Sequence, residues 1–580
     1  MASPPNSTRP FSKGWGMANQ LPATKASLRL KFLLTRDQAS MTEKIESFDY
    51  IVVGAGSAGS VIGARLSENP DSKVLVLEAG GKDWMPLYKV PLLAGILFRH
   101  RYNNWWYETD PEPGLNNRRL RWPRGKVLGG SNQLNGMVYT RGHRLDYDVW
   151  RQLGNEGWAY DDVLPHFKKS EDFQGPDADY HGKGGPLTVS PHGIKNQLYD
   201  ALIDSGREAG FPVTEDFNEP EREGFGRYHF TIKDGHRCST ARAFLEPAIS
   251  RQNLSVRTKC HTTRILLDKG RAVGLEYVQD SQIKTVRVES EIVLSGGAIN
   301  SPQLLLLSGI GPPDHLNEFG IKVEHNLPGV GENLHDHLVA RLQYAVHNNV
   351  DLYDEFRLDK VAWHVFRALF FRSGLGTSFP LEGGCFIKTR PELQTPDIQC
   401  NFVPALIPTT HLPFAQSPLG YKHGFYHGVH QTQPESRGWL RLRSSDPFRP
   451  PKMIANYLAA ENDRSTLRNG VIIMRDVFKE KPMAKHVCQE LRPGTDVTSE
   501  EDIDAWIRAS GDTVFHPVGS CKMGKDQMAV VDPQLRVRGL EGLRVADASI
   551  MPVITSGNTN APSIMVGEKC ADMILSERNQ

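Results

Sequence analysis

Phe48-Asp-Tyr-Ile-Val-Val53 leads directly into Gly54-Ala-Gly56-Ser-Ala-Gly59, and these two runs decide the fold. A helix-compatible segment follows, and then a second apolar run, Lys73-Val-Leu-Val-Leu77-Glu78, that ends in an acid. This order of strand, glycine-rich turn, helix and strand predicts a βαβ unit. Gly54 allows the tight turn, Gly56 lets the backbone approach a pyrophosphate, and Gly59 lets the helix pack closely on the strand.

The surroundings of the glycines predict a dinucleotide site. The N-terminus of the helix would offer unpaired N–H groups to the phosphates. Glu78 ends the second strand, where a carboxylate accepts hydrogen bonds from ribose hydroxyls. The glycine pattern by itself is common in ordinary loops, so the flanking strands, the helix and the acid carry this prediction. The pattern does not distinguish NAD from FAD.

The bulk composition is that of an ordinary globular protein. The 580 residues include 39% hydrophobic and 23% charged residues, and 68 basic against 67 acidic residues give a net charge of +1. This balance produces no global field that would attract nucleic acid, so no nucleic-acid partner is expected. The seven cysteines form no CxxC pair, which favours a reducing compartment and argues against a disulfide framework or a zinc site.

Residues 1–45 are predicted to be a leader. Positions 1–36 hold six Lys or Arg and no Asp or Glu, and 26–34 form a short basic amphipathic piece. A transit peptide or a membrane-surface anchor fits this composition. A disordered leader, or a start upstream of the functional Met41, is the favoured alternative. The expected localisation is cytoplasmic or peripherally membrane-associated, with organelle targeting as an option.

Four later segments complete a family pattern. They are a second glycine-rich loop at Arg124–Met137, a strand–turn–helix at 297–312, Phe515-His516-Pro517 with Cys521-Lys-Met-Gly524, and Asp547-Ala-Ser-Ile-Met-Pro552 with Gly557-Asn-Thr-Asn560-Ala-Pro562. With these motifs, the chain resembles the glucose–methanol–choline (GMC) oxidoreductases over about residues 46–577. Among them it is most similar to the choline dehydrogenases and the bacterial aliphatic alcohol dehydrogenases.

The resemblance implies FAD rather than NAD, and an α/β fold. A discontinuous Rossmann-type FAD-binding domain would come from 46–169, 236–335 and 510–577. A substrate-binding domain on an antiparallel sheet would come from 336–509, with an insertion at 170–235, and alternating runs such as 439–443 agree with such a sheet. The residues expected to line the flavin are Gly54, Gly56, Gly59, Glu78, Gly129, Gly130, Asn135, Thr262 (through its backbone), Asp547, Asn560 and Pro562.

One position departs from part of the family. Several oxidases of this family carry a histidine in the second glycine-rich loop that bonds covalently to the flavin. Leu134 stands at the corresponding position here and cannot form that bond. FAD is therefore expected to be held without a covalent link.

His516 and Asn560 are the expected catalytic residues. Oxidation of an alcohol removes a proton from the oxygen and a hydride from the carbon; the flavin accepts the hydride, and the protein receives the proton. Histidine suits the base because its ordinary pKa is about 6.5. Asn560 would hold the alkoxide-like oxygen through an uncharged amide donor. A single histidine before proline is more often structural, so the resemblance carries this assignment.

Two further sites have weaker support. Glu382 could face the substrate and, with nearby aromatic rings, attract a quaternary ammonium; alternatively it could pair with an arginine. His335 and His337 flank Asp336, but no third ligand is evident nearby in the sequence, so no metal is expected.

The resulting prediction is an FAD-dependent dehydrogenase that oxidises a primary alcohol to the aldehyde. Choline and an aliphatic alcohol rank nearly level, since the apolar segment 361–371 could line a channel for alkyl chains or form a core helix. The electron acceptor would be a quinone or another carrier, or oxygen if the protein is an oxidase. A flavin-containing lyase on the same scaffold is a further alternative.

Overall fold

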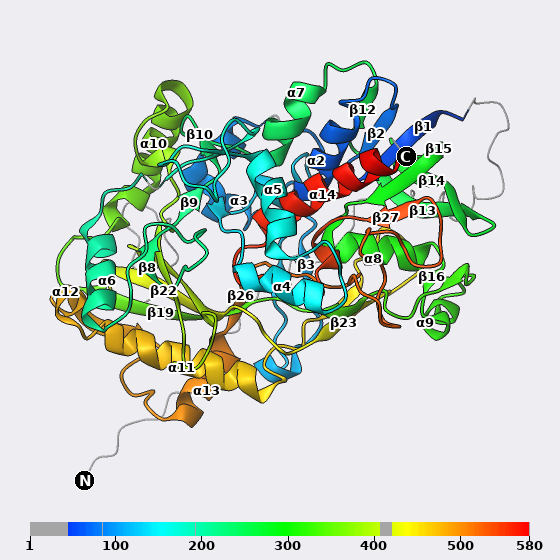
Figure 1. Ribbon diagram of the computed structural model, residues 1–580. Coiled ribbons are helices and arrows are strands. Elements are labelled where there is room, and N and C mark those ends of the chain that lie inside the picture. Colours follow the sequence, from blue (N-terminus) through cyan, green and yellow to red (C-terminus); the bar gives the residue numbers. More distant parts are fainter. Residues whose placement is uncertain (1–44, 84, 192, 407–419, 579–580) are drawn as a thin grey trace, which may run out of the picture.

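A computed structural model describes residues 45–83, 85–191, 193–406 and 420–578. Nearly all of the predicted leader lies outside the described residues. Two seven-stranded sheets organise the described chain, and helices pack against both of them (Figure 1).

The first sheet is built around the predicted βαβ unit. Its strand order is β12-β2-β1-β15-β14-β13, and β27 also pairs with β15. The strands are β1 (Ser47–Val53), β2 (Val74–Leu77), β12 (Leu254–Arg257), β13 (His261–Asp268), β14 (Arg271–Gln279), β15 (Gln282–Leu294) and β27 (Leu543–Val545). The β12, β2, β1, β15 and β27 strands are mutually parallel, whereas β13, β14 and β15 pair antiparallel. All four residues of β2 are buried, as expected for a parallel strand covered on both faces.

The glycines of the βαβ unit are required by close contacts. Helix α2 (Ser57–Leu66) starts directly after Gly56. A Cβ on Gly59 would lie 1.9 Å from the carbonyl oxygen of Gly54, so only glycine lets the helix pack this near the turn. The C-terminal helix α14 (Asn560–Arg578) packs against α2 and α5 (Tyr160–Ser170). The end of the chain thereby covers its beginning.

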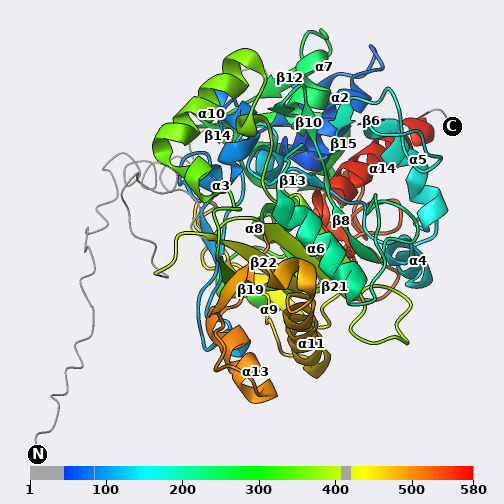
Figure 2. The same cartoon turned by 90° about the vertical axis from the view of Figure 1, so that its left-hand side faces the viewer.

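The second sheet is antiparallel throughout, with the order β25-β19-β22-β21-β20-β8, and β26 also pairs with β19. Its strands are β8 (Gly224–Arg227), β19 (Leu338–Val346), β20 (Gly383–Ile387), β21 (Ile398–Val403), β22 (Gly424–Gln431), β25 (Val487–Arg492) and β26 (Asp512–Thr513). Helix α11 (Glu461–Val477) packs on β21 and β22, and Figure 2 shows α11 and α6 (Gln197–Glu208) beside this sheet. The predicted combination of a Rossmann-type sheet and an antiparallel sheet is confirmed.

The strand expected at 439–443 belongs elsewhere. It forms β23 (Gly438–Arg441), which pairs with β18 (Glu332–Leu334) and β24 (Lys452–Ile454) in a separate three-stranded sheet. Alternation predicted the strand type correctly, because β23 is half-buried in alternate positions. Alternation does not identify the strand's partners, since these lie more than ten residues away on both sides.

Candidate active site

A cavity of about 680 Å³ lies where the two sheets approach each other. Gly54, Gly56 and Glu78 line it from the βαβ unit, and Asn401 and Val403 line it from the antiparallel sheet. This is a common volume for a site that holds a small molecule or cofactor. The cavity therefore joins the predicted dinucleotide site to the predicted substrate domain.

The end of the cavity at the βαβ unit fits a dinucleotide. No side chain caps the N-terminus of α2, so its first N–H groups stay available to a phosphate. A Cβ added to Gly56 would meet nothing within 4 Å, which means that the backbone faces open space there. The buried hydroxyl of Thr262, which lines the cavity, has no hydrogen-bond partner within the described chain. The residues present thus fit FAD.

Glu78 is held in place by the backbone. Its carboxylate oxygens accept hydrogen bonds from the N–H groups of Ala55 (3.0 Å) and Gly80 (2.7 Å). Burial raises the pKa of Glu78 to about 7, although these hydrogen bonds oppose the rise. The carboxyl group lines the cavity at the end of β2, which is the position that the sequence predicts for a ribose contact.

The second glycine-rich loop packs directly on the first. Gly129 and Gly130 have φ values of +89° and +55°, which favour glycine. A Cβ on Gly130 would lie 2.8 Å from the Cα of Gly56, so only glycine allows this approach, and the Gly129 N–H donates to the carbonyl oxygen of Ala55 (2.8 Å). Leu134 and Asn135 of this loop line the cavity.

Asp547 lines the cavity and is held by hydrogen bonds, whereas three other predicted flavin residues lie outside the described lining. Asp547 lines the cavity, and its carboxylate accepts from the Gly297 N–H (2.8 Å) and the Ser301 hydroxyl (2.6 Å). Gly59, Gly129 and Pro562 are not among the described residues that line the cavity.

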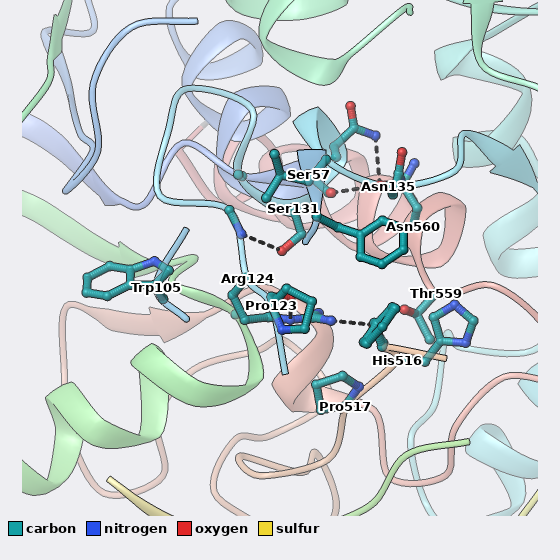
Figure 3. Close-up of a pocket in the computed structure, with 18 of the residues that line it drawn as sticks. Ser57, Trp105, Pro123, Arg124, Ser131, Asn135, His516, Pro517, Thr559 and Asn560 are labelled. Carbon is teal, nitrogen blue, oxygen red and sulfur yellow. Dashed lines mark hydrogen bonds between the residues drawn. The ribbon is translucent and has the colours of Figure 1, made fainter. Parts of the chain in front are cut away.

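His516 lines the cavity (Figure 3), and a chain of hydrogen bonds behind it determines which of its ring nitrogens carries the proton. The Nε2 atom of His337 lies 2.7 Å from the carbonyl oxygen of Thr432, which can only accept, so this nitrogen is the donor. In the neutral ring the Nδ1 atom of His337 is then an acceptor. It lies 3.0 Å from Nδ1 of His516, which must donate. The Nε2 atom of His516 then carries no proton, and it lies 3.2 Å from the Nδ2 atom of Asn558.

The environment keeps His516 neutral. Burial lowers its pKa well below the ordinary 6.5, and His337, His430 and Arg124 lower it further. Burial also lowers the pKa of His337, to about 4. At neutral pH the histidine in the cavity is thus an unprotonated base with a defined tautomer.

The backbone around His516 is held by Asp336. This buried carboxylate accepts from the His516 N–H (2.6 Å), from the Tyr457 hydroxyl and from the Thr513 hydroxyl. Phe515, directly before the histidine, has a φ of +70°, which is rare for a bulky residue. Arg124 donates to the carbonyl oxygen of Phe515 (2.6 Å). The strained turn is therefore fixed from both sides.

Asn558 is the asparagine that contacts His516, whereas the sequence pointed to Asn560. The Nδ2 atom of Asn558 lies 3.2 Å from Nε2 of His516. Asn560 begins α14, and its Oδ1 accepts from the Ser57 hydroxyl and the Asn132 amide, both at 2.8 Å. Asn560 also lines the cavity, where it joins α14 to α2 and the second glycine-rich loop. The Asn-Thr-Asn run offered two equivalent candidates two residues apart, and only the fold separates them.

Glu382 does not face the cavity. It is buried, it is not among the described lining residues, and its carboxylate is paired with Arg227. It also accepts from the N–H groups of Gly193 (3.1 Å) and Ile194 (3.0 Å). Of the two alternatives for this residue, the arginine pair is the one observed. The expectation of a cation site at Glu382 is not retained.

His335 and His337 bond to different partners. The Nδ1 atom of His335 lies 2.6 Å from the Asn333 carbonyl oxygen, and its Nε2 accepts from the Ile554 N–H at 3.0 Å. Each ring thus has a structural hydrogen bond, and His337 in addition contacts His516. Sequence reasoning weighed His337 only as a metal ligand and missed this contact.

Comparisons with known proteins identify the family. Two family models, both for GMC oxidoreductase, match residues 48–339 and 434–567. An oxygen-dependent choline dehydrogenase of Sinorhizobium medicae (strain WSM419) is 44% identical over 533 residues, covering 91% of this chain and 96% of that protein. Another, from Chromohalobacter salexigens, is 44% identical over 532 residues, covering 91% and 94%.

Solved structures give the same result. A pyridoxine 4-oxidase from Mesorbium loti superposes with a TM-score of 0.82 at 32% identity, covering 91% of this chain and 99% of that one. A variant of the formate oxidase of Aspergillus oryzae RIB40, studied for FAD modification, has a TM-score of 0.86 at 27% identity, covering 93% and 100%.

Proposed function

The chain belongs to the GMC oxidoreductase family and is an FAD-dependent enzyme of alcohol oxidation, and on this premise we propose that His516 is the base that takes the proton from a primary alcohol. The observation that carries this proposal is the unprotonated Nε2 atom of a neutral histidine in the cavity. When bound, FAD supplies the acceptor for the hydride that leaves the carbinol carbon.

The chain's own residues divide the remaining work. The alcohol O–H donates to Nε2 of His516, and the proton moves to this nitrogen as the C–O bond becomes the C=O bond of the aldehyde. The amide of Asn558 donates to the oxygen while negative charge develops on it. His337 holds the His516 ring in the required tautomer, in the way that an acceptor orients the histidine of a catalytic triad.

The substrate is proposed to be uncharged. Three carboxylates line the cavity within the described residues, and none is free to balance a cation. The Glu78 and Asp547 carboxylates accept backbone hydrogen bonds at the cofactor end, and Asp512 pairs with Arg341 at 2.6 Å. Apolar lining residues such as Phe98 and Val403 suit an alkyl or aryl group. Choline is the second candidate, because the relatives that are 44% identical are choline dehydrogenases.

Choline and its neutral isostere 3,3-dimethylbutan-1-ol separate these candidates. The test is the anaerobic rate of flavin bleaching with each alcohol. We expect the neutral alcohol to be favoured about tenfold or more in kcat/KM, because the ammonium would be desolvated without an unpaired anion. Faster bleaching by choline would overturn the proposal for an uncharged substrate while leaving alcohol oxidation intact. Glu382→Gln is the matched control and is expected to leave this ratio unchanged.

The acceptor is tested on the same samples. Reoxidation of the reduced flavin by oxygen and by a water-soluble quinone is compared by stopped flow. We propose that the quinone is the faster acceptor; faster reoxidation by oxygen would make the protein an oxidase. A lyase would leave the flavin oxidised during turnover, and such an outcome would overturn alcohol oxidation itself.

FAD is proposed to be bound without a covalent link, since Leu134 occupies the place of the linking histidine. Acid precipitation of the holoenzyme is expected to release all the yellow colour into the supernatant as intact FAD. Flavin that stays with the pellet, detected by peptide mass spectrometry, would contradict this.

A further inference from the structure

A second set of hydrogen bonds reaches the cavity from the antiparallel sheet and ends at Asn558. It starts at Tyr228, which directly follows β8, and includes Gln399 of β21 and His430 of β22. These three side chains are buried, and none of them is among the described residues that line the cavity. Proton transfer itself needs none of them, so their arrangement requires another explanation.

Tyr228 fixes the direction of the first hydrogen bond. Its hydroxyl lies 2.6 Å from the carbonyl oxygen of Cys400, which can only accept, so the single hydroxyl hydrogen is used there. The Tyr228 oxygen is therefore the acceptor toward the side-chain amide of Gln399, at 3.2 Å. The Gln399 atom at this contact must be Nε2, because the oxygen of the amide has no hydrogen to donate. The orientation of this amide thus follows from a backbone carbonyl group.

Gln399 then fixes the orientation of Asn558. With Nε2 toward Tyr228, the Oε1 atom of Gln399 lies 3.0 Å from Nε2 of His430, which is the donor at this contact. Burial holds the pKa of His430 well below 6.5, so its ring is neutral and carries its one proton at that nitrogen. The Nε2 atom of Gln399 also lies 3.3 Å from the side-chain amide of Asn558. Since an N–H group needs an acceptor, the Asn558 atom at this contact is Oδ1.

The two chains of hydrogen bonds meet between Asn558 and His516. With Oδ1 held by Gln399, the Nδ2 atom of Asn558 lies 3.2 Å from Nε2 of His516. The contact with His337 separately leaves this histidine nitrogen without a proton. A donor therefore faces an acceptor, although the two chains start at different backbone carbonyl groups. An alcohol oxygen needs both, an acceptor for its hydrogen and a donor for the charge that develops on it.

We propose that Gln399 is a positioning residue, which keeps the amide nitrogen of Asn558, rather than its oxygen, toward the reacting alcohol. This rests on the proposed function, in which Asn558 donates to the alcohol oxygen. If the Gln399 amide turned over, its oxygen would face the Tyr228 oxygen, and the Asn558 amide would have to turn as well. The oxygen of Asn558 would then face the unprotonated nitrogen of His516 and the developing negative charge, without a hydrogen to share.

Two substitutions separate this role from simple packing. Gln399→Met keeps an unbranched side chain of similar length but removes both the donor and the acceptor. Gln399→Glu keeps the shape, and in its ionised form the carboxylate can only accept. Packing alone would tolerate both changes, whereas positioning of Asn558 requires the N–H group that both remove.

Anaerobic flavin reduction of the full-length holoenzyme, measured over a range of alcohol concentrations, tests the proposal. We expect Gln399→Met to lower the limiting rate about 10–100-fold with little change in the alcohol concentration that gives half of it, because an oriented donor acts mainly in the transition state. Gln399→Glu should lose at least as much. The matched control is Gln431→Met, which is expected to keep the wild-type rate. Gln431 is a buried glutamine of β22 that donates to the backbone carbonyl of Gln433 (3.3 Å) and is not among the described lining residues.

A double-mutant cycle with Asn558 distinguishes positioning from a general loss of structure. Asn558→Ala alone should slow flavin reduction about 10²–10³-fold, the usual loss for a donor to developing charge. In this background Gln399→Met should cost less than about twofold, because no amide is left to orient. The same loss from Gln399→Met with and without the Asn558 amide would overturn the positioning role.

The proposed function and the positioning role fail in different ways. Wild-type rates in both His516→Ala and Asn558→Ala would overturn the proposed function. A slow Asn558→Ala together with a wild-type rate in Gln399→Met would overturn only the positioning role. If the Gln399 variants do not bind FAD, Tyr228→Phe takes their place, since it removes the acceptor that sets the direction of the Gln399 amide. It should cost about 3–10-fold, and a wild-type rate in this variant would overturn the positioning role instead.

Discussion

Two buried groups of histidines behave in opposite ways. At the cavity, His516 and His337 contact each other, a backbone carbonyl and an amide. Between strands β6 (Glu171–Phe173) and β7 (Leu187–Val189), His181 lies between two carboxylates: its Nδ1 is 3.0 Å from Glu171, and its Nε2 is 2.6 Å from Asp216. Both groups are almost inaccessible to water.

The difference lies in the partners of the rings. Burial lowers the pKa of His516 well below 6.5, and no carboxylate contacts its ring to oppose this effect. Burial also acts to lower the pKa of His181, but the hydrogen bonds to Asp216 and Glu171 outweigh it and raise the pKa. The first group therefore supplies a neutral base, and the second a cation within an ion network. For His516 and His181, hydrogen bonds to carboxylates rather than depth of burial make the difference in pKa.

Removing the base should produce the largest effect. His516→Ala is expected to leave FAD bound but to slow anaerobic flavin reduction by a good alcohol by about 10²–10⁴-fold. The flavin absorbance spectrum and the rapid-reaction rate are the measurements. The matched control is His181→Ala, which removes another buried histidine. It is measured on the folded fraction that retains FAD. A loss below tenfold for His516→Ala would mean that another group takes the proton.

Breaking the ion network should change stability and leave catalysis intact. Asp216→Asn leaves the charge of His181 poorly balanced, and removal of one partner from a buried pair costs about 3–5 kcal/mol. The midpoint of urea unfolding at neutral pH should fall, with little change in the rate of flavin reduction. Asp204→Asn removes the carboxylate of an exposed pair with Arg207 and should cost about 0–1 kcal/mol. Equal losses of unfolding free energy in Asp216→Asn and Asp204→Asn would show that the buried network contributes no more stability than the exposed pair.

Removing the contact that fixes the tautomer of His516 should have an intermediate effect on the rate of flavin reduction. His337→Phe removes the acceptor for Nδ1 of His516, so the base can take the unproductive tautomer and turn in its pocket. We expect a loss of about 10–100-fold in flavin reduction and little change in KM. A readout apart from rate is the nitrogen NMR spectrum of the His516 ring, which should lose the signature of a single tautomer protonated at Nδ1. If the FAD-bound His337→Phe variant reduced its flavin at the wild-type rate, His337 would have no positioning role.

The pH dependence of stability should carry the smallest effect. For His516, His337 and His430 the folded pKa is lowered, so the unfolded state binds more protons as pH falls below about 6.5, and these residues make the fold less stable in acid. For His181 the folded pKa is raised, so its contribution is present below 6.5 and is lost as pH rises through the folded pKa. The measurement is Tm between about pH 5 and 8. His516→Gln should reduce the loss of Tm on the acid side of this range. If it instead reduced the change of Tm on the alkaline side, the folded pKa of His516 would be raised rather than lowered.

Local sequence predicted the features that depend on neighbouring residues. The βαβ unit follows from glycines and apolar runs within 48–78, and His516 was found through its motif. The partners of these elements come from far away in the chain. Glu382 receives its arginine from Arg227 because β8 pairs with β20, and nothing near either residue reveals this. Asn558 and Asn560 look equivalent until the start of α14 turns one of them toward Ser57.

The late position of β27 and α14 bears on how the protein is made. Residues 543–545 complete the sheet beside β15, which is more than 200 residues earlier in the chain (282–294), and 560–578 cover α2, which is earlier still (57–66). During synthesis the apolar surface of the first sheet stays uncovered until β27 and α14 have been made. The unfinished chain exposes this surface for longer than a contiguous domain would, and chaperones would shield it until the final residues leave the ribosome.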